Sequence, residues 1–229
     1  MNPINVYNVS VSHHGTCLKN ISFSVPDRVL FAVHCQDEET GSLLTEVLCG
    51  MRKPDSGSAL LLGQKPSAVR GETGTAAVYR NKGSIFSDMK VGVFLYHSCR
   101  LHGMSKTFAK LYSQKLLDEC CLRQYEELSC GRIPVTAART AAIAASVCRD
   151  PAVLIADDPA EGLSAREADR MYDLLFAQSM KRTVAVVTRS AETLIHSQMA
   201  VIIRRGQTAF CGNGFDAASF AAAEQDEKA

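Results

Sequence analysis

The sequence has no long hydrophobic run, no excess of one charge and no paired-cysteine motif. No apolar segment approaches the roughly 20 residues that a membrane-spanning helix needs, and the first residues lack the apolar core that defines a signal peptide. The formal net charge is +1, so bulk charge points neither to nucleic acid nor to a membrane surface. The nine cysteines contain neither CxxC nor a metal-ligand spacing. These absences favour a cytoplasmic protein with free thiols.

What is present is typical of a globular α/β protein. The chain has 229 residues, of which 46% are apolar and 21% are charged, enough for one or two domains. Apolar runs of strand length alternate with segments of helical spacing. We expect strands at 4–12, 19–25, 29–33, 58–63, 76–80, 152–158 and 183–188, and a hairpin at 200–212. We expect helices at 42–48, 89–121, 134–147 and 165–178, and a short one in the tail at 216–229.

The order of these segments predicts their arrangement. Continuous apolar strands such as VLIA and VAVV are typical of a parallel sheet that is covered on both faces. The N-terminal strands alternate apolar and polar residues, which predicts an antiparallel β subdomain. The long helical stretch in the middle of the chain predicts an inserted helical subdomain.

Four segments, in order, carry a resemblance to a known family. They are LCGMRKPDSGSALLLGQ, MKVGVFLYHSCRLHGMS, DPAVLIADDPAEGLS and TVAVVTRS. Over about residues 6–212 the chain resembles the ATP-binding subunit of ABC transporters, and the second segment is most similar to the exporter-type branch. The resemblance implies a P-loop NTPase-like core. It also implies a single nucleotide-binding domain over 1–229, with the core and β subdomain at 1–81 and 148–212, the helical subdomain at 82–147 and the tail at 213–229.

The phosphate-binding loop that the resemblance implies has unusual residues. The three glycines of the family's loop align with Cys35, Glu38 and Thr40. The lysine aligns with Gly41, and the hydroxyl residue that binds magnesium aligns with Ser42. Losing glycine restricts the backbone angles that let amides converge on phosphate. A like charge about 4 Å from a phosphate costs roughly 4 kcal/mol at an effective dielectric near 20. We therefore expect ATP to bind poorly or not at all, so no cofactor is expected unless the loop still functions.

The other positions implied by the resemblance also depart from the family pattern. Asn81 aligns with a glutamine of the family. Asp157 matches the family's magnesium-binding aspartate, and it would bind the ion together with Ser42 if Mg-ATP were bound. Asp158 matches the catalytic glutamate but is one methylene shorter, which puts its reach in doubt. Arg189 replaces the switch histidine, and its fork could hold a phosphate or an acid.

The family's signature motif has two candidate positions in this chain. Counting back without a gap from the Asp-Pro pair at 150–151 places it at IPVTA, which comprises Ile133, Pro134, Val135, Thr136 and Ala137. Proline at the serine position removes a hydroxyl and an N–H. The segment LSCGR, with Ser129 and Gly131, looks more like the motif but needs an insertion. We favour the gapless position and keep the second open.

Two further expectations concern contacts. The first helix should present free amides and a partial positive charge at its start. Asp37, Glu38 or Glu39 could fold back onto those amides, with Thr40 helping to cap the helix. In the helical region, Gly92 and Val93 replace a polar pair, so the groove that takes a membrane subunit's coupling helix in this family should be more apolar.

The functional interpretation follows from these departures. We expect a degenerate subunit that pairs as a heterodimer with a competent ABC ATPase subunit and docks on a transmembrane permease, peripheral on the inner face of a membrane, without nucleic acid. The alternative is a slow ATPase with phosphate contacts rearranged onto Arg80, Lys82 or Arg189. A third hypothesis is a soluble ABC-like protein unrelated to transport.

Overall fold

The computed structural model describes residues 2–69, 75–80 and 87–226. Among these residues the larger sheet has six strands in the order β5-β6-β7-β3-β8-β9. All neighbouring pairs are parallel except β8 and β9, which form the predicted hairpin. The strands are β3 (Leu30–Cys35), β5 (Ala76–Arg80), β6 (Val153–Asp157), β7 (Thr183–Thr188), β8 (Met199–Arg204) and β9 (Gln207–Asn213). The side chains of β3 and β7 are buried along their whole length, as a sheet covered on both faces requires.

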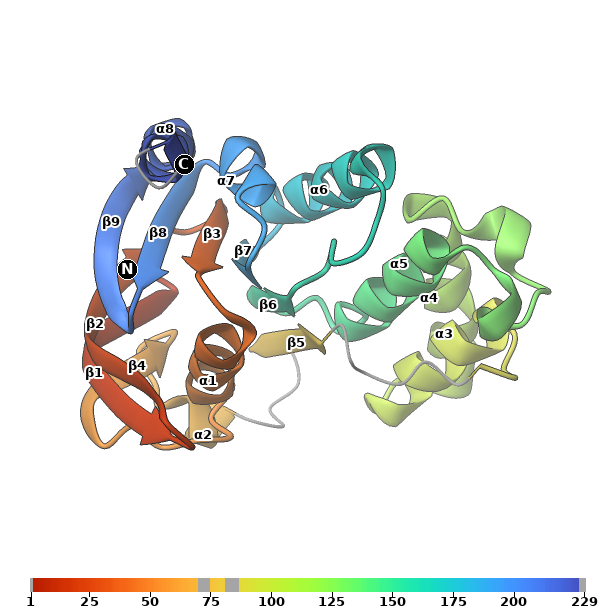
Figure 1. Ribbon diagram of the computed structural model, residues 1–229. Helices are drawn as coiled ribbons and strands as arrows, with labels where there is room; N and C mark the ends of the chain where they lie inside the picture. Colours follow the sequence, from red (N-terminus) through yellow and green to blue (C-terminus); the bar gives the residue numbers. More distant parts are fainter. Residues whose placement is uncertain (1, 70–74, 81–86, 227–229) are drawn as a thin grey trace.

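A smaller antiparallel sheet lies beside the first. Its strands are β1 (Ile4–His13), β2 (Thr16–Val25) and β4 (Ser56–Leu61), in the order β2-β1-β4. Helix α1 (Glu38–Leu48) lies between the two sheets, as Figure 1 shows. Its Leu44 and Leu48 are fully buried in a core that residues of both sheets share. Burial of this helix therefore joins the two sheets into one body.

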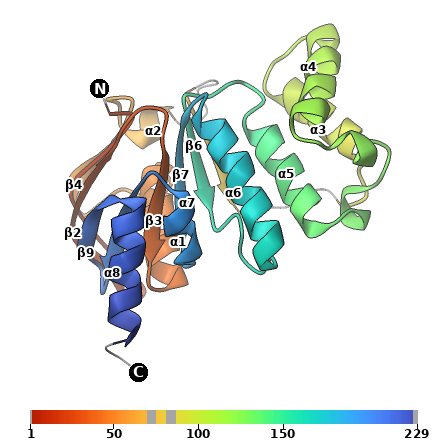
Figure 2. The same cartoon turned by 90° about the horizontal axis from the view of Figure 1, so that it is seen from above.

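The middle of the chain forms a helical lobe, which we define as residues 91–148. It contains α3 (Val91–Leu101), α4 (Lys106–Glu119), the 3-10 helices η1 (Arg123–Tyr125) and η2 (Cys130–Arg132), and α5 (Val135–Ser146). These helices pack around a core of their own and lie at the end of the molecule opposite α8 (Figures 1 and 2). The single helical pattern expected at 89–121 is in fact two helices, because Gly103 adopts a φ of +84° between them.

The remaining helices cover the sheet and close the chain. They are α2 (Pro66–Val69), α6 (Ala165–Ser179), α7 (Glu192–His196) and α8 (Gly214–Asp226). The predicted α/β fold, with a mainly parallel sheet, an antiparallel β part and inserted helices, is confirmed. The nine cysteines are all free thiols, as expected. Among the described residues, no helix has the length and apolarity that crossing a membrane requires.

Candidate functional site

The candidate site lies where three neighbouring strands end. β6, β7 and β3 are adjacent and parallel, so their carboxyl ends meet at one edge of the sheet. Ligands of open α/β sheets bind outside this edge. Cys35, Asp157 and Thr188 are the last residues of these strands, and the segments that follow them carry the candidate residues. Asn81 lies outside the described residues, as does Lys82.

The segment expected to form a phosphate loop is largely helical. Only residues 36 and 37 separate β3 from α1, which begins at Glu38 rather than at the expected Ser42. Glu38, Thr40, Gly41 and Ser42 therefore lie in the helix, while Cys35 ends the strand. An aspartate N-cap followed by two glutamates in the first turn favours this early start, since negative charge stabilises a helix N-terminus.

Asp37 caps this helix with its own side chain. Its Oδ1 atom accepts a hydrogen bond of 2.7 Å from the backbone N–H of Thr40, and its carbonyl oxygen accepts one of 3.3 Å from Gly41. The prediction that an acid of this segment folds back onto the helix start is thus confirmed for Asp37. Glu39, by contrast, is exposed. The amides that bind phosphate in a P-loop protein are here partly satisfied by the chain's own carboxylate.

Gly41, at the implied lysine position, faces the sheet. A Cβ atom added there would lie 3.5 Å from Cγ1 of Val187 and 3.8 Å from Cβ of Cys35, which is ordinary van der Waals contact. A longer side chain in this conformation would therefore start toward the packed ends of β3 and β7. The Cys35 thiol is fully buried, and burial raises its pKa well above the usual range, so it stays neutral.

Arg189 stands at the centre of an acidic cluster. Its Nε atom lies 3.6 Å from Oδ2 of Asp158, its Nη1 atom lies 4.0 Å from Oε2 of Glu38, and its Nη2 atom pairs with Oε1 of Glu161. The backbone N–H of Arg189 also donates to Oδ1 of Asp158 at 3.2 Å. We call Arg189, Glu38, Asp158 and Glu161 the arginine cluster. It joins the start of α1, the segment after β6 and the end of β7 through ion pairs of one guanidinium with three carboxylates.

The two aspartates at the end of β6 have different surroundings. The Oδ2 atom of Asp157 lies 3.6 Å from Nε of Arg80. Burial, followed by the nearby Asp158 carboxylate, raises the pKa of Asp157 above its usual range. Asp158 has a φ of +43°, which is uncommon for a residue with a side chain. Its backbone N–H is held by the carbonyl oxygen of Val187 at 2.8 Å, so this conformation is fixed from the neighbouring strand.

The two signature candidates occupy different structures. Helix α5 begins directly after Pro134, which is its N-cap residue and offers no capping side chain. Ile133 and Ala137 are buried, Val135 is exposed, and Thr136 Oγ1 donates to Oε1 of Glu167 at 3.0 Å. In the second candidate, the backbone of Ser129 forms an isolated antiparallel β-bridge with that of Lys90. The N–H of Gly131 donates to the carbonyl of Ser87 at 2.8 Å. An α-helix therefore starts at the first candidate and a 3-10 helix, with Ser129 as its N-cap residue, at the second, so the position of the signature motif stays a prediction.

Glu167 connects the starts of two helices and was missed by sequence reasoning. Its Oε2 atom accepts from the N–H of Ser164 at 3.1 Å and from the hydroxyl at 2.6 Å, while Oε1 accepts from Thr136. These three hydrogen bonds lower the pKa of the Glu167 carboxyl, the Ser164 hydroxyl contributing most. The pattern Ser-x-x-Glu at 164–167 is a capping-box signature and would have predicted the first of these contacts, in which the Glu167 carboxylate accepts the backbone N–H of Ser164.

A groove of about 740 Å³ crosses the helical lobe. Its lining includes Val93 and Tyr96 from α3 and Leu111 from α4, with lysines and glutamates at the rim. The added Cβ at Gly92 would lie 2.9 Å from Cγ of Glu126, so glycine permits this close approach. The expected apolar surface at 92–93 therefore forms part of the lining of this groove.

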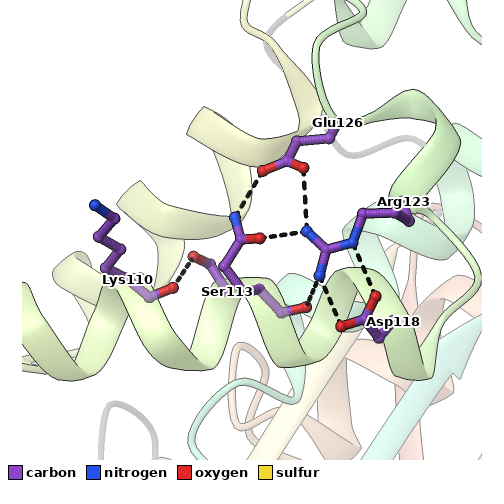
Figure 3. Close-up of polar contacts among 6 residues, drawn as sticks. Lys110, Ser113, Asp118, Arg123 and Glu126 are labelled. Atoms are coloured by element: carbon purple, nitrogen blue, oxygen red, sulfur yellow. Dashed lines mark hydrogen bonds and ion pairs between the residues drawn. The ribbon is translucent and has the colours of Figure 1, made fainter.

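One wall of this groove is held by a network around Arg123 (Figure 3). Arg123 donates to both oxygens of Asp118, at 2.8 and 2.6 Å, and to Oε2 of Glu126 at 3.1 Å. The amide of Gln114 donates to Oε1 of Glu126 at 2.6 Å. Glu126 in turn accepts the N–H of Gly92 through its backbone at 3.0 Å. These contacts connect Gln114, Glu126 and Gly92, which all line the groove.

Comparison with known proteins identifies the class to which this fold belongs. No protein-family model matches the chain. The ATP-binding protein EcfA2 of the energy-coupling factor transporter of Acetivibrio thermocellus is 23% identical over 228 residues, covering 90% of this chain and 76% of the relative. The Nod factor export ATP-binding protein I of Burkholderia orbicola is 24% identical over 193 residues, covering 83% of this chain and 64% of the relative.

A solved structure shows the same fold. CbiO1 from Clostridium perfringens, part of the ABC transporter complex CbiONQ, matches with a TM-score of 0.84 at 17% identity, over 99% of this chain and 94% of that one. The fold is therefore that of ABC transporter ATP-binding subunits, and both curated relatives are ATP-binding proteins of transport systems. The exporter-type branch stays a prediction, because the relatives include an energy-coupling factor protein as well as an export protein.

Proposed function

We propose that this chain is a subunit of an ABC transporter complex that acts as a structural and coupling partner without hydrolysing ATP. It pairs with a competent ATPase subunit and lies on the inner face of a membrane, docked on a permease. The observation that carries this proposal is the replacement of phosphate contacts by contacts within the chain, at the helix start and at the arginine cluster.

The helix start does not fit the phosphates of Mg-ATP. The Asp37 carboxylate accepts the N–H of Thr40, so phosphate would have to displace a negative charge from the site it seeks. Glu38 lies beside it, and an uncompensated like charge at about 4 Å costs roughly 4 kcal/mol at an effective dielectric near 20. Gly41 supplies no cation to offset this. These contacts support a subunit that works without nucleotide.

The arginine cluster is a second observation that supports a subunit working without nucleotide. Arg189 joins α1 to the segment after β6 through ion pairs with Glu38, Asp158 and Glu161. A nucleotide and its magnesium ion connect such elements in an active P-loop protein. The slow ATPase considered above would need Arg189 to leave three carboxylates in order to reach a phosphate. The cluster therefore favours a permanently connected core.

The groove in the helical lobe supports docking. Its lining includes the apolar side chains of Val93 and Leu111, which are 42% and 66% exposed. Exposed apolar surface rimmed by polar residues is typical of a binding site. Its prearranged wall lowers the ordering cost of binding. We propose that the groove receives a helix of the permease.

The test has two parts. The purified chain is titrated with Mg-ATP in a calorimeter, and micromolar binding would contradict the proposal. The tagged chain is then purified from its native membranes, where we expect an ATPase subunit with an intact phosphate loop and a permease to come with it. The proposal fails if transport stays complete after this chain is deleted.

A groove variant separates docking from folding. Val93→Asp together with Leu111→Asp places charge in the apolar lining and should abolish capture of the permease. Leu101→Asp is the matched control, since Leu101 is 85% exposed on α3 and does not line the groove. Equal capture by both variants would exclude the groove as the docking surface.

A further inference from the structure

Part of the charge in the groove of the helical lobe is already paired within the chain. The charged residues of the lining are Lys90, Lys106, Lys110, Glu126 and Glu127. Nζ of Lys90 lies 2.7 Å from Oε2 of Glu127. The Glu126 carboxylate accepts from the amide of Gln114 at 2.6 Å and from Nη1 of Arg123 at 3.1 Å. These hydrogen bonds, with that from Gln114 contributing most, lower the pKa of Glu126. Both acids of the groove therefore have partners.

Lys106 and Lys110 differ from these residues because neither ammonium group has a partner. Neither forms an ion pair or a side-chain hydrogen bond with any residue that the structure describes. Both residues are exposed, and they lie four positions apart, so they occupy one face of α4. Figure 3 shows the side chain of Lys110 extending away from Arg123 and Glu126. We call Lys106 and Lys110 the cationic pair.

The place of this pair on α4 is unfavourable for stability. Lys106 is the first residue of the helix, and the first turn contains no acid. Because a helix N-terminus carries a partial positive charge, a cation there is destabilising and an acid is stabilising. The starts of α1 and α6 follow this rule, with Glu38, Glu39 and Glu167 in their first turns. A lysine at a disfavoured place, with a second one a turn later in the same groove, favours a role in binding an anionic group.

The cationic pair lies toward one end of the groove. Residues 102–105 alone join α3 to α4, so Lys106 lies where the chain turns between the two helices. Farther along α4, Gln114 contacts Glu126, whose carbonyl oxygen accepts the N–H of Gly92 near the start of α3. With a rise of 1.5 Å per residue, about 12 Å of helix separates Lys106 from Gln114. A docked helix of about two turns would therefore reach both ends.

We propose that the permease helix received by this groove carries an aspartate or glutamate beside its apolar residues, and that Lys106 and Lys110 bind this carboxylate. The apolar residues of that helix contact Val93 and Leu111, and the carboxylate lies about one helical turn, or about 5 Å, along it. Charge complementarity of this kind sets the register of a docked helix and rejects wrong partners. This inference rests on the proposed function and adds the chemistry by which the groove selects its partner.

Helices of other chemistry fit the groove less well. A basic helix would bring like charge against the cationic pair, while both acids of the groove already have partners. A purely apolar helix would remove water from two ammonium groups without giving them a partner, which costs free energy. A carboxylate avoids both costs, because it accepts charge-assisted hydrogen bonds from the ammonium groups.

The test compares how much permease two variants of the tagged whole chain capture from native membranes. Lys106→Glu with Lys110→Glu reverses the cationic pair and should weaken capture by at least about tenfold, since attractive contacts become repulsive. Lys53→Glu with Lys65→Glu is the matched control, because both lysines are exposed, lie outside the groove and change the net charge equally. The control should capture as much permease as the unchanged chain.

Thermal unfolding shows whether loss of capture comes from misfolding. Glutamate in the first turn of α4 favours the helix, so the reversed chain should melt at or slightly above the Tm of the unchanged chain. Lys106→Gln with Lys110→Gln removes the charges without adding new ones and should weaken capture about fivefold. Replacing the acidic residue of the captured permease helix by lysine should restore capture by the reversed chain, and a lack of rescue would overturn direct pairing.

Three further results would overturn the inference, and they separate it from the proposed function. If the reversed chain captures as much permease as the control, the groove does not select a carboxylate, although the proposed function stands. If the cationic pair binds lipid instead, the unchanged chain will bind phosphatidylglycerol vesicles without the permease, and reversal will abolish that binding while leaving capture unchanged. If the unchanged chain captures no permease, the inference and the proposed function fail together.

Discussion

Replacing Arg189 by glutamine should destabilise the protein in a salt-dependent way. The change removes three ion pairs and leaves Glu38, Asp158 and Glu161 without their common cation. The Arg189 side chain is 38% exposed, so each pair counts as a partly screened surface pair. Such pairs contribute about 0.2–1 kcal/mol each, and we expect a total loss of about 1–2 kcal/mol in the free energy of unfolding.

The assay is thermal unfolding followed by circular dichroism at two salt concentrations. For a chain of this size, a loss of 1 kcal/mol lowers Tm by about 2–4 °C, so the variant should melt about 2–8 °C below the original protein. The Debye length falls from about 10 Å at 0.1 M salt to about 3 Å at 1 M. The difference in Tm should therefore shrink at high salt. Arg189→Lys keeps the charge but loses the fork and should give an intermediate loss.

Two results would refute this reasoning. If Arg189→Gln melts at the same temperature as the original protein, the cluster does not hold the three segments together. If the loss in Tm is the same at both salt concentrations, it comes from lost packing rather than from charge. Arg166→Gln on the exposed side of α6 serves as the control and should change Tm little.

Three further predictions concern single positions. Asp37→Ala removes the N-cap of α1 and should cost about 1 kcal/mol in unfolding free energy, while Asp37→Ser should restore most of it; equal losses in urea titrations would show that the cap is unimportant. Asp157 has a raised pKa in the folded state, so its contribution to stability is present below the unfolded pKa and is lost as pH rises through the folded pKa. Asp157→Asn should therefore be more stable than the original protein at neutral pH, a gain that vanishes near about pH 3; a constant difference across pH would contradict the assigned cause. Gly103→Ala forces a side chain into a left-handed conformation and should cost about 1–2 kcal/mol, with faster hydrogen exchange in α3 and α4 rather than in the sheet if the lobe opens separately.

The sequence predicted the sheet well because its strands carry their own signal. β7 coincides with the run TVAVVT, and β8 and β9 form the expected hairpin, since continuous apolar runs and turn residues are local features. Boundaries that depend on one backbone angle were less predictable. The pattern at 89–121 is helical in composition, and it is divided by the positive φ of Gly103 and by Ser105, whose side chain caps the start of α4.

The candidate site was predictable in position but not in its contacts. Asp157, Asp158 and Arg189 fall at the expected strand ends because the order of strands fixes where those ends meet. Arg189 pairs with Glu38 and Glu161 because segments far apart in the sequence meet in the fold. No local sequence pattern predicts these ion pairs. The capping box at 164–167 was visible in the sequence, whereas its hydrogen bond to Thr136 was not.

The orientation of Gly41 bears on whether one substitution could give this helix start a phosphate-binding lysine. Substituting lysine alone would direct the new side chain toward Val187 and Cys35 rather than toward a phosphate. A working loop would first require the opening turn of α1 to unwind, which means losing the Asp37 cap before any phosphate contact is gained. Losing the cap lowers stability before any new contact can offset it. A phosphate loop with the usual lysine would therefore need several substitutions at this helix start together, because no single one both frees the amides and places a cation beside them.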